Sequence, residues 1–385
     1  MLNSNALLSD ITEQKQTTQN FNFLHQVQQK KLINMTDLDA LLLVNPMMYD
    51  DGNRDVWNSN YSSSIDHLIV MVNGTGGSAK DWMFATEQFV QVFPDKVFVH
   101  RSKQNVDKLA KDGVDVMGER LAREVIDVIQ RNPNVRKISF IAYSVGGLVA
   151  RYAIGRLYRT PENEPMQNSR NAESNADSVG TICGLQAMNF ITLATPHLGL
   201  SGHKQFPFLT GKTKLERIAR KIAPRTDGKT GGHLFLTDGA EQTHPLLLSM
   251  VTDSNECYFM SALRAFKHRV VYANVINDHV VGWGTASIRV DSIRRQWDGI
   301  RNEKYPHIVY EEDCQACDIV GDNSSYSIPE EMVKGLSSVA WEKVDVSFNR
   351  GFIKLEAHNL IQVANPSRHI EGADVIQHII DHFHT

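Results

Sequence analysis

The chain has 385 residues, of which 42% are hydrophobic and 22% are charged, the composition of a globular protein with a sizeable buried core. Its formal net charge of −4 argues against a nucleic-acid-binding protein, because such proteins usually carry a strong basic excess. The sequence has no apolar run of about 18 residues, and its first residues lack the pattern of a secretory signal, so we expect neither a transmembrane helix nor secretion.

Four cysteines are too few and too scattered for a disulfide framework, and reduced thiols fit an intracellular, cytoplasmic protein. Targeting to an organelle by the N-terminal residues stays open. Cys314 and Cys317 form one CxxC pair. Zinc sites normally need a second pair, and we identify no other Cys or His pair at matching spacing. The sequence therefore predicts no metal, and we expect no cofactor.

Residues 1–60 are polar and rich in Gln and Asn, which predicts a partly disordered N-terminal tail. We expect residues 61–385 to form the folded domain. Apolar and amphipathic runs in it predict strands over 67–72, 96–100, 137–142, 188–193 and 268–275, and helices over 81–92, 116–129, 147–158 and 373–383. Alternation of helices with apolar strands predicts an α/β protein with a mostly parallel sheet, covered by helices on both faces.

Two segments do not follow this alternation. Residues 159–179 are rich in Pro, Asn and Glu, which predicts a flexible surface insertion. Residues 200–265 predict a cap or lid region, and they include a basic amphipathic stretch from Lys212 to Ile222. That stretch fits a cap helix over a pocket, a surface that meets anionic lipid, or a solvated helix face.

One strand, turn and helix sequence carries a candidate nucleophile. Residues 138–149 are an apolar strand, a tight turn with Ser144, and an apolar helix. Such a turn pushes a serine hydroxyl out of the sheet, beside the first N–H of the helix, here that of Val145. The usual G-x-S-x-G pattern is changed, because Ala142 replaces the first glycine.

A serine hydroxyl needs a base within hydrogen-bond reach and an acid that orients this base. Asp278, just after the predicted strand 268–275, is the candidate acid, with a strand-ending turn residue as the structural alternative. His358 is the candidate base, because it follows a strand-like run over 352–355 and precedes the terminal helix; His279 and His369 are the alternatives. The chain order is Ser, Asp, His.

An oxyanion hole needs two N–H donors. Val145 supplies one, and we expect Thr75, in the glycine-rich loop after strand 67–72, to supply the other, with Gly76 as the alternative. This loop lacks the Gly-Lys-Ser/Thr order of a phosphate-binding loop. His197, in Thr-Pro-His, is a candidate for the substrate pocket, although a histidine at such a position more often holds a loop by hydrogen bonding.

Several blocks of sequence resemble the putative serine esterase family of α/β-hydrolases, which has many plant members and lipase-like fungal relatives. These blocks are HLIVMVNGTGGSAKDW (67–82), DVMGER (115–120), AYSVGGLVARYAIGRLY (142–158), FITLATPHLG (190–199), HLFLTDG (233–239), DHVVGWGTASIR (278–289) and AHNLIQV (357–363). The resemblance implies the α/β-hydrolase fold, a Ser–His–Asp triad, and hydrolysis of carboxylic esters, with lipids as substrates. Tyr143 stands where the family usually has His, so we expect it at the substrate pocket with an effect on acyl preference.

We therefore predict a serine esterase or lipase that acts on a lipid or small ester, with peripheral membrane contact through residues 212–225. Acyl transfer or thioester hydrolysis by the same triad is one alternative. The other is a non-catalytic scaffold with a hydrolase fold, which the altered turn at Ala142 and Tyr143 suggests.

Overall fold

The computed structural model describes residues 55–56, 64–161, 180–201, 227–239, 244–289, 302–317, 326–349 and 356–385. Most of the predicted tail, nearly all of the predicted insertion, the basic stretch 212–225 and the strand-like run 352–355 lie outside these residues. Among the residues described, no helix is both long and apolar enough to cross a membrane.

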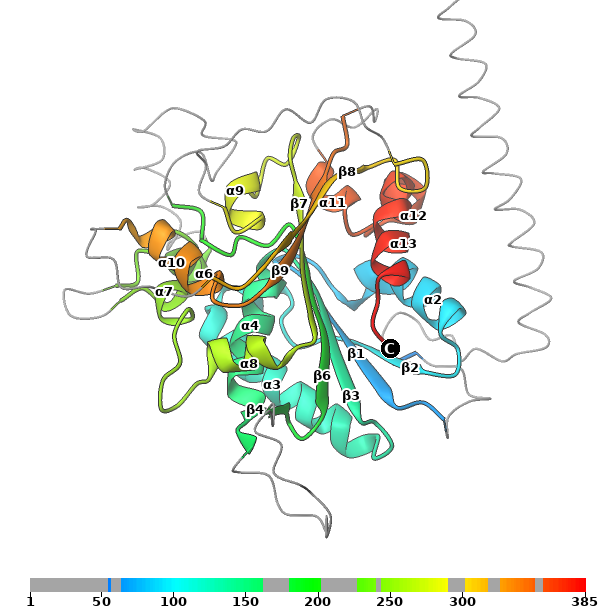
Figure 1. The fold of residues 1–385 in the computed structure, drawn as a ribbon, viewed down its shortest axis with the longest axis horizontal. Helices are drawn as coiled ribbons and strands as arrows, with labels where there is room; N and C mark the ends of the chain where they lie inside the picture. Colours follow the sequence, from blue (N-terminus) through cyan, green and yellow to red (C-terminus); the bar gives the residue numbers. More distant parts are fainter. Residues whose placement is uncertain are drawn as a thin grey trace, which may run out of the picture. The chain divides into compact units, whose positions relative to one another are not determined.

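Seven strands within the described ranges form one sheet, in the order β2-β1-β3-β6-β7-β9-β8 (Figure 1). Their bounds are β1 His67–Val72, β2 Val97–Arg101, β3 Lys137–Tyr143, β6 Gln186–Leu193, β7 His268–Asn274, β8 Ile308–Cys314 and β9 Trp341–Val346. All neighbouring pairs are parallel except β8 and β9 at one edge. A separate antiparallel pair joins β4 (Tyr158–Arg159) to β5 (Thr181–Ile182).

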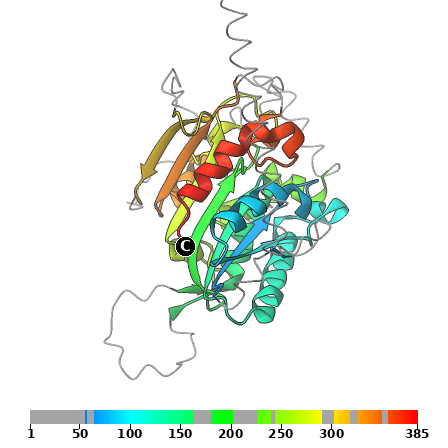
Figure 2. The same ribbon diagram turned by 90° about the vertical axis from the view of Figure 1, so that its right-hand side faces the viewer.

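Helices cover both faces of this sheet. On one face lie α3 (Val114–Arg131), α4 (Val145–Leu157) and α8 (Phe259–Ala265), and on the other lie α2 (Met83–Val92) and α13 (Ala373–Asp381) (Figure 1). Figure 2 shows α13, in red, beside α2 in front of the sheet. The shorter helices are α6 (Gly228–Leu234), α7 (Leu246–Ser249), α9 (Trp283–Ala286), α10 (Ile328–Leu336), α11 (Ala357–Leu360) and α12 (Pro366–His369). The predicted fold class, an α/β-hydrolase fold with a mostly parallel sheet, is confirmed.

The strand order determines where a ligand site can form. From β1 the chain first goes outward to β2, then returns to the other side of β1 as β3, and continues through β6 and β7. In open α/β sheets, ligands bind outside the carboxyl ends of the strands, where the strand order reverses. Here that point lies between the loop after β1 and the turn after β3, which contain Thr75 and Ser144.

The strands β8 and β9 were not predicted from the sequence. The strand β9 lies between β7 and β8, yet it includes Lys343 and Asp345, which interrupt its apolar pattern. Both side chains are buried with partners: the Lys343 ammonium donates to the Ile288 carbonyl at 2.9 Å, and Asp345 accepts from the Trp283 indole at 2.8 Å. Burial of charge is tolerated when it is paired in this way, and no sequence pattern shows such pairing.

Two residues of the predicted tail contact the sheet. Val56 and Val99 exchange two backbone hydrogen bonds, of 2.9 and 3.0 Å. Next to them, the buried ring of His100 lies 2.5 Å from the Asp55 carboxylate and 3.1 Å from that of Glu124 on α3. Asp55 and Val56, which precede the predicted boundary at residue 61, thus contact the sheet in the described structure.

The His100 cluster predicts a dependence of stability on pH. Burial lowers the pKa of His100, but hydrogen bonds and the charges of Asp55 and Glu124 outweigh burial and raise this pKa to about 8. Because this folded-state pKa is above the unfolded value of about 6.5, the stabilisation, on the order of 2 kcal/mol, is complete below pH 6.5 and is lost as pH rises through 8.

Melting temperatures at pH 6 and pH 9 should therefore differ less in His100→Gln than in the wild type. A matched change at the exposed His244 should leave the wild-type difference in place, and equal pH profiles for all three proteins would contradict the prediction.

Candidate active site

Ser144 lies in a sharp turn between β3 and α4. Its φ of +54° is in a region that non-glycine residues rarely adopt, at a cost on the order of 1–3 kcal/mol. Two hydrogen bonds hold the turn: the Ser144 N–H donates to the Leu193 carbonyl at 2.9 Å, and the Thr195 hydroxyl donates to the Ser144 carbonyl at 2.8 Å. The strained turn places the serine at the carboxyl edge of the sheet, next to the first N–H of α4.

The glycines around this turn allow backbone segments to approach closely. A Cβ atom on Gly146 would lie 2.5 Å from the Asn73 carbonyl oxygen, and one on Gly74 would lie 2.7 Å from the Ser144 Cβ. The loop after β1 is therefore packed directly against the turn and the start of α4. Ala142, by contrast, is fully buried between β1 and β6, so a methyl group fits where the usual pattern has glycine.

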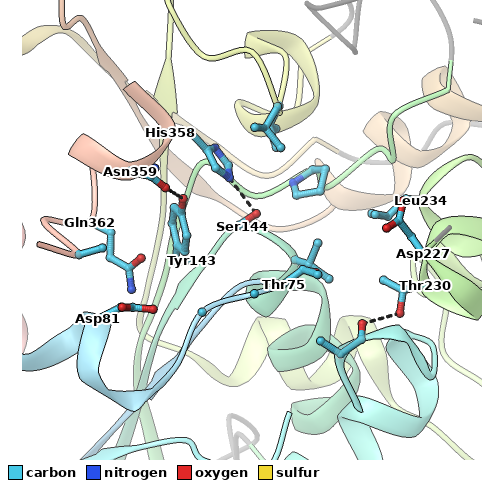
Figure 3. A pocket seen from close by; sticks show the side chains of 18 of the residues that line it. Thr75, Asp81, Tyr143, Ser144, Asp227, Thr230, Leu234, His358, Asn359 and Gln362 are labelled. Atoms are coloured by element: carbon cyan, nitrogen blue, oxygen red, sulfur yellow. Dashed lines mark hydrogen bonds between the residues drawn. The ribbon is translucent and has the colours of Figure 1, made fainter. Parts of the chain in front are cut away.

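His358, at the start of α11, connects Ser144 to Asp278. The His358 Nε2 atom lies 3.0 Å from the Ser144 Oγ (Figure 3). Its Nδ1 lies 2.9 Å from the Asp278 Oδ2. Because an ionised carboxylate only accepts hydrogen bonds, Nδ1 carries the proton, and the Nε2 lone pair faces the serine hydroxyl. The structure thus brings together the three residues that the sequence predicted as a triad.

Asp278 is buried and accepts four hydrogen bonds. Its Oδ2 accepts from His358 and from the Asn274 amide at 2.9 Å, and its Oδ1 accepts from the N–H groups of Val280 and Val281 at 3.0 and 2.8 Å. Burial raises the pKa of Asp278, but the charge of His358 and these hydrogen bonds outweigh burial, and the pKa is lowered. The carboxylate is therefore ionised at neutral pH, as an orienting acid requires. Asn274 was not predicted, and no sequence signal distinguishes it.

The alternative histidines are placed differently. His369 lines the same cavity, but its Nε2 lies 3.0 Å from the Glu356 carboxylate, and its Nδ1 accepts from the Asn365 N–H at 3.1 Å. His279, next to Asp278, is half-buried, and its Nε2 atom has no hydrogen-bond partner. Only His358 among the three forms a hydrogen bond with Ser144 in the described structure.

A cavity of about 780 Å³ opens above Ser144. Its lining includes Thr75, Gly76 and Val145, the three predicted oxyanion donors, and Figure 3 shows Thr75 beside Ser144. Further apolar residues in its lining are Ala110, Pro196, Leu200, Leu234, Phe235, Val280 and Val281. Three of these, Leu200, Leu234 and Phe235, belong to the region predicted as a cap, so the described part of that region forms a wall of the cavity.

Tyr143 also lines the cavity, as predicted, and it contacts α11, the helix that carries His358. Its hydroxyl donates to the Asn359 Oδ1 at 3.1 Å, and its ring centroid lies 4.9 Å from that of His358 (Figure 3). Burial, with the charges of Asp278 and Asp81, raises the pKa of Tyr143 well above its usual value, so the hydroxyl stays protonated. The partner Asn359 was not identified from the sequence.

The prediction that His197 belongs to the substrate pocket is wrong. Its ring is fully buried beneath the cavity wall, where its Nε2 lies 2.9 Å from the Thr192 hydroxyl and its ring packs against Trp341. Burial lowers the pKa of His197 well below its usual value, so the ring is neutral. Its neighbour Pro196 lines the cavity instead, and His197 holds the loop from below.

The close packing of Gly146 predicts a large effect of a small substitution. In Gly146→Ala the new methyl group would force the loop after β1 away from the turn and displace the N–H of Thr75. Loss of one oxyanion donor typically lowers kcat by 10²–10³-fold, and we expect a decrease on that order for the predicted ester hydrolysis. In the control Gly232→Ala, the new Cβ would make only an ordinary contact, 3.7 Å from the Thr237 hydroxyl. Equal activity of the two variants would rule out the predicted role of the loop.

Comparison with known proteins finds relatives that carry lipase names. The chain is 27% identical over 284 residues to "Putative lipase C4A8.10" of Schizosaccharomyces pombe, a match that covers 69% of this chain and 32% of the relative. It is 30% identical over 227 residues to "Putative lipase ROG1" of Saccharomyces cerevisiae, covering 58% of this chain and 28% of the relative. The matched region thus spans about a third of the length of these relatives.

Among solved structures, the propeptide form of the Bacillus licheniformis lipase BlEst2 aligns with a TM-score of 0.33 and 16% identity, covering 55% of this chain and 38% of that one. The Pyrococcus furiosus esterase Pf2001 aligns with a TM-score of 0.30 and 13% identity, covering 59% and 67%.

A family model with the description "Putative serine esterase (DUF676)" matches residues 62–288, more than half of the chain. The match includes Ser144 and Asp278 and ends before His358. By this match the chain belongs to the putative serine esterase family.

Proposed function

We propose that the protein is a serine hydrolase that cleaves carboxylic esters, and that its substrates are lipid acyl esters. The observation that carries this proposal is the continuous chain of hydrogen bonds from Ser144 through His358 to Asp278, at the floor of a largely apolar cavity. Membership of the putative serine esterase family supports the same activity.

In the proposed acylation step, the Ser144 Oγ attacks the ester carbonyl carbon while the His358 Nε2 takes the hydroxyl proton. The carbonyl electrons move to oxygen, and the N–H groups of Val145 and Thr75 stabilise this oxyanion. When the oxyanion collapses, the bond to the alcohol oxygen breaks and His358 returns the proton to the leaving alcohol. Asp278 holds the His358 tautomer and stabilises its transient positive charge.

Deacylation repeats these steps with water. His358 removes a proton from the water molecule as its oxygen attacks the acyl carbon, and the same donors stabilise the second oxyanion. Collapse releases the carboxylic acid and returns the proton to Ser144. No further group is needed to balance the reaction.

The shape of the cavity supports a substrate with an apolar acyl chain. Its lining includes the apolar Leu200, Leu234 and Phe235, and Figure 3 shows Asp81, Asn359 and Gln362 near Tyr143. An acyl chain would gain about 0.8 kcal/mol for each CH₂ group that it buries against the apolar side chains.

A fluorophosphonate probe tests this proposal, because it phosphonylates only a serine whose base and oxyanion donors are in place. We expect one equivalent of probe per chain on the peptide that contains Ser144, and no labelling after heat denaturation or in His358→Ala. Product analysis with esters, thioesters and competing alcohol acceptors then separates hydrolysis from acyl transfer. Absence of labelling in the folded wild type would favour the non-catalytic scaffold.

We also propose an intracellular location and peripheral contact with membranes. The four cysteines are free, which supports a reducing compartment. Basic residues between 212 and 225 predict binding to anionic vesicles that weakens as salt concentration rises. Sedimentation with phosphatidylserine vesicles, using Lys212→Gln/Lys214→Gln/Arg217→Gln as the variant and phosphatidylcholine vesicles as the control, measures this. Salt-insensitive binding, or equal binding by the variant, would contradict the prediction.

A further inference from the structure

A second cluster of side chains lies at the edge of the sheet that β8 forms. Glu311 on β8 faces His378 on α13 and His382, which caps that helix. One possible ligand atom from each of the three residues lies within 4.8 Å of the others. None of the three lines the cavity above Ser144, and the proposed hydrolysis uses none of them.

His378 is the buried member of this cluster. Its side chain has no exposed surface, and its Nδ1 lies 2.8 Å from the Tyr272 hydroxyl. Its Nε2 has no hydrogen-bond partner, although it lies 3.4 Å from the Glu311 Oε2. A buried ring nitrogen without a hydrogen bond is costly, so it requires an explanation.

The ring of His382 is also held through its Nδ1 atom. Its Nδ1 donates to the His378 carbonyl at 2.8 Å, which leaves the Nε2 lone pair available. The two histidines are four residues apart, and their ring centroids lie 4.1 Å from each other on one side of the helix. Histidines that bind metals usually donate their second ring N–H to a protein oxygen, as both rings can do here.

Glu311 completes the cluster with a carboxylate, whose Oε2 atom lies 3.4 Å from the His378 Nε2. Its side chain is 40% exposed, which leaves a path from solvent to the cluster.

We propose that Glu311, His378 and His382 bind a divalent transition metal, and that zinc suits the site best. Zinc bonds of about 2.0–2.2 Å to nitrogen and oxygen place tetrahedral ligand atoms about 3.4 Å apart. The Nε2 of His378 and the Oε2 of Glu311 are already separated by this distance. Two imidazoles and one carboxylate suit zinc, and water would fill the fourth position.

Such a metal would join the C-terminal helix to the edge of the sheet. The strand β8 pairs only with β9 in the described sheet, and α13 packs on the face that it shares with α2. By binding Glu311 and both histidines, the metal would hold α13 against β8. The helix α13 follows the segment that carries His358. The proposed role is to stabilise this part of the fold, and it does not depend on ester hydrolysis.

His378 and His382 have H-x₃-H spacing, which is a common zinc-binding pattern. The expectation that no His pair has matching spacing is therefore wrong. No sequence pattern connects Glu311 with this pair, because Glu311 lies 67 residues before His378 and only folding brings the two together.

Titration of the full chain with Co²⁺ and Zn²⁺ tests the proposal. The protein is first stripped with a chelator, and every measurement is repeated in Cys314→Ser/Cys317→Ser, which removes the nearby thiols as ligands. We expect one Co²⁺ per chain with the visible absorption of a tetrahedral nitrogen and oxygen site, and its displacement by one Zn²⁺. Zinc at 100-fold excess over Kd should raise Tm by about 5 °C.

The variants Glu311→Gln and His382→Ala each remove one exposed ligand, so they keep the buried His378 and its contact with Tyr272. Each removes a direct ligand, so each should weaken Zn²⁺ binding by more than the roughly 100-fold upper cost of losing an outer partner of a ligand, and should abolish most of the rise in Tm, whereas His244→Ala should match the wild type. The proposal is overturned if the wild type binds no Zn²⁺ at 100 μM, a concentration set at roughly 100-fold above a micromolar Kd. It is also overturned if Cys314→Ser/Cys317→Ser alone abolishes Zn²⁺ binding. A third contradicting result is Zn²⁺ binding by Glu311→Gln and His382→Ala that is as tight as in the wild type. Either of these two results would mean that Glu311 and His378 contact each other without forming a metal site.

Discussion

Replacement of Ser144 by alanine should lower kcat for ester hydrolysis by on the order of 10⁴–10⁶-fold. The variant retains the turn, the backbone donors and the cavity, but it has no atom that can form the acyl-enzyme. Its Tm should stay within about 2 °C of the wild type, because the turn is held by bonds from the Ser144 backbone to Leu193 and Thr195, which alanine also makes. Initial rates with short-chain and long-chain esters, measured together with thermal melts, check both parts.

The matched control is Ser261→Ala, at a serine that lies outside the cavity and bonds to Asp253. It should retain wild-type kcat. If Ser144→Ala keeps more than about a tenth of the wild-type rate, another nucleophile acts, and the proposed assignment of Ser144 fails.

The second large effect is expected for Asp278→Asn, which should lower kcat by on the order of 10⁴-fold with little change in KM. Asparagine has the volume of aspartate, but its amide nitrogen is a donor. Because the Asp278 oxygens accept from His358, from Asn274 and from the N–H groups of Val280 and Val281, that nitrogen must replace one acceptor. If the amide nitrogen points toward His358, it favours the His358 tautomer that carries its proton on Nε2. A protonated Nε2 cannot accept the proton of Ser144.

The control for this variant is Asp253→Asn, since Asp253 also accepts two backbone N–H bonds, from Met260 and Ser261, but lies away from the cavity. It should cost some stability and leave kcat unchanged. Fluorophosphonate labelling of Asp278→Asn should slow in proportion to kcat. Equal rates in Asp278→Asn and the wild type would show that another group orients His358.

The strongest parts of the fold could be predicted because their patterns are local. The strand β1 is apolar after His67 and fully buried, and α3 has one apolar face, so both were placed to within a few residues of their observed bounds. The strand β9 was missed because Lys343 and Asp345 are satisfied by Ile288 and Trp283, which are distant in sequence. Short helices such as α7 and α9, with four residues each, give no periodic signal at all.

For the candidate site, the sequence by itself determined the residue types and their order: a serine in a strand–turn–helix, a glycine-rich loop, and an aspartate and a histidine further along the chain. Only the tertiary structure decided which partners meet, since His358 is 214 positions from Ser144 and 80 from Asp278. It also assigned His197 to the interior, Asn274 and Asn359 to the surroundings of the triad, and Glu311 to the two histidines of α13. The physical reason is that turn conformation and apolar periodicity act between near neighbours in the chain, whereas hydrogen bonds between side chains depend on how the strands and helices pack.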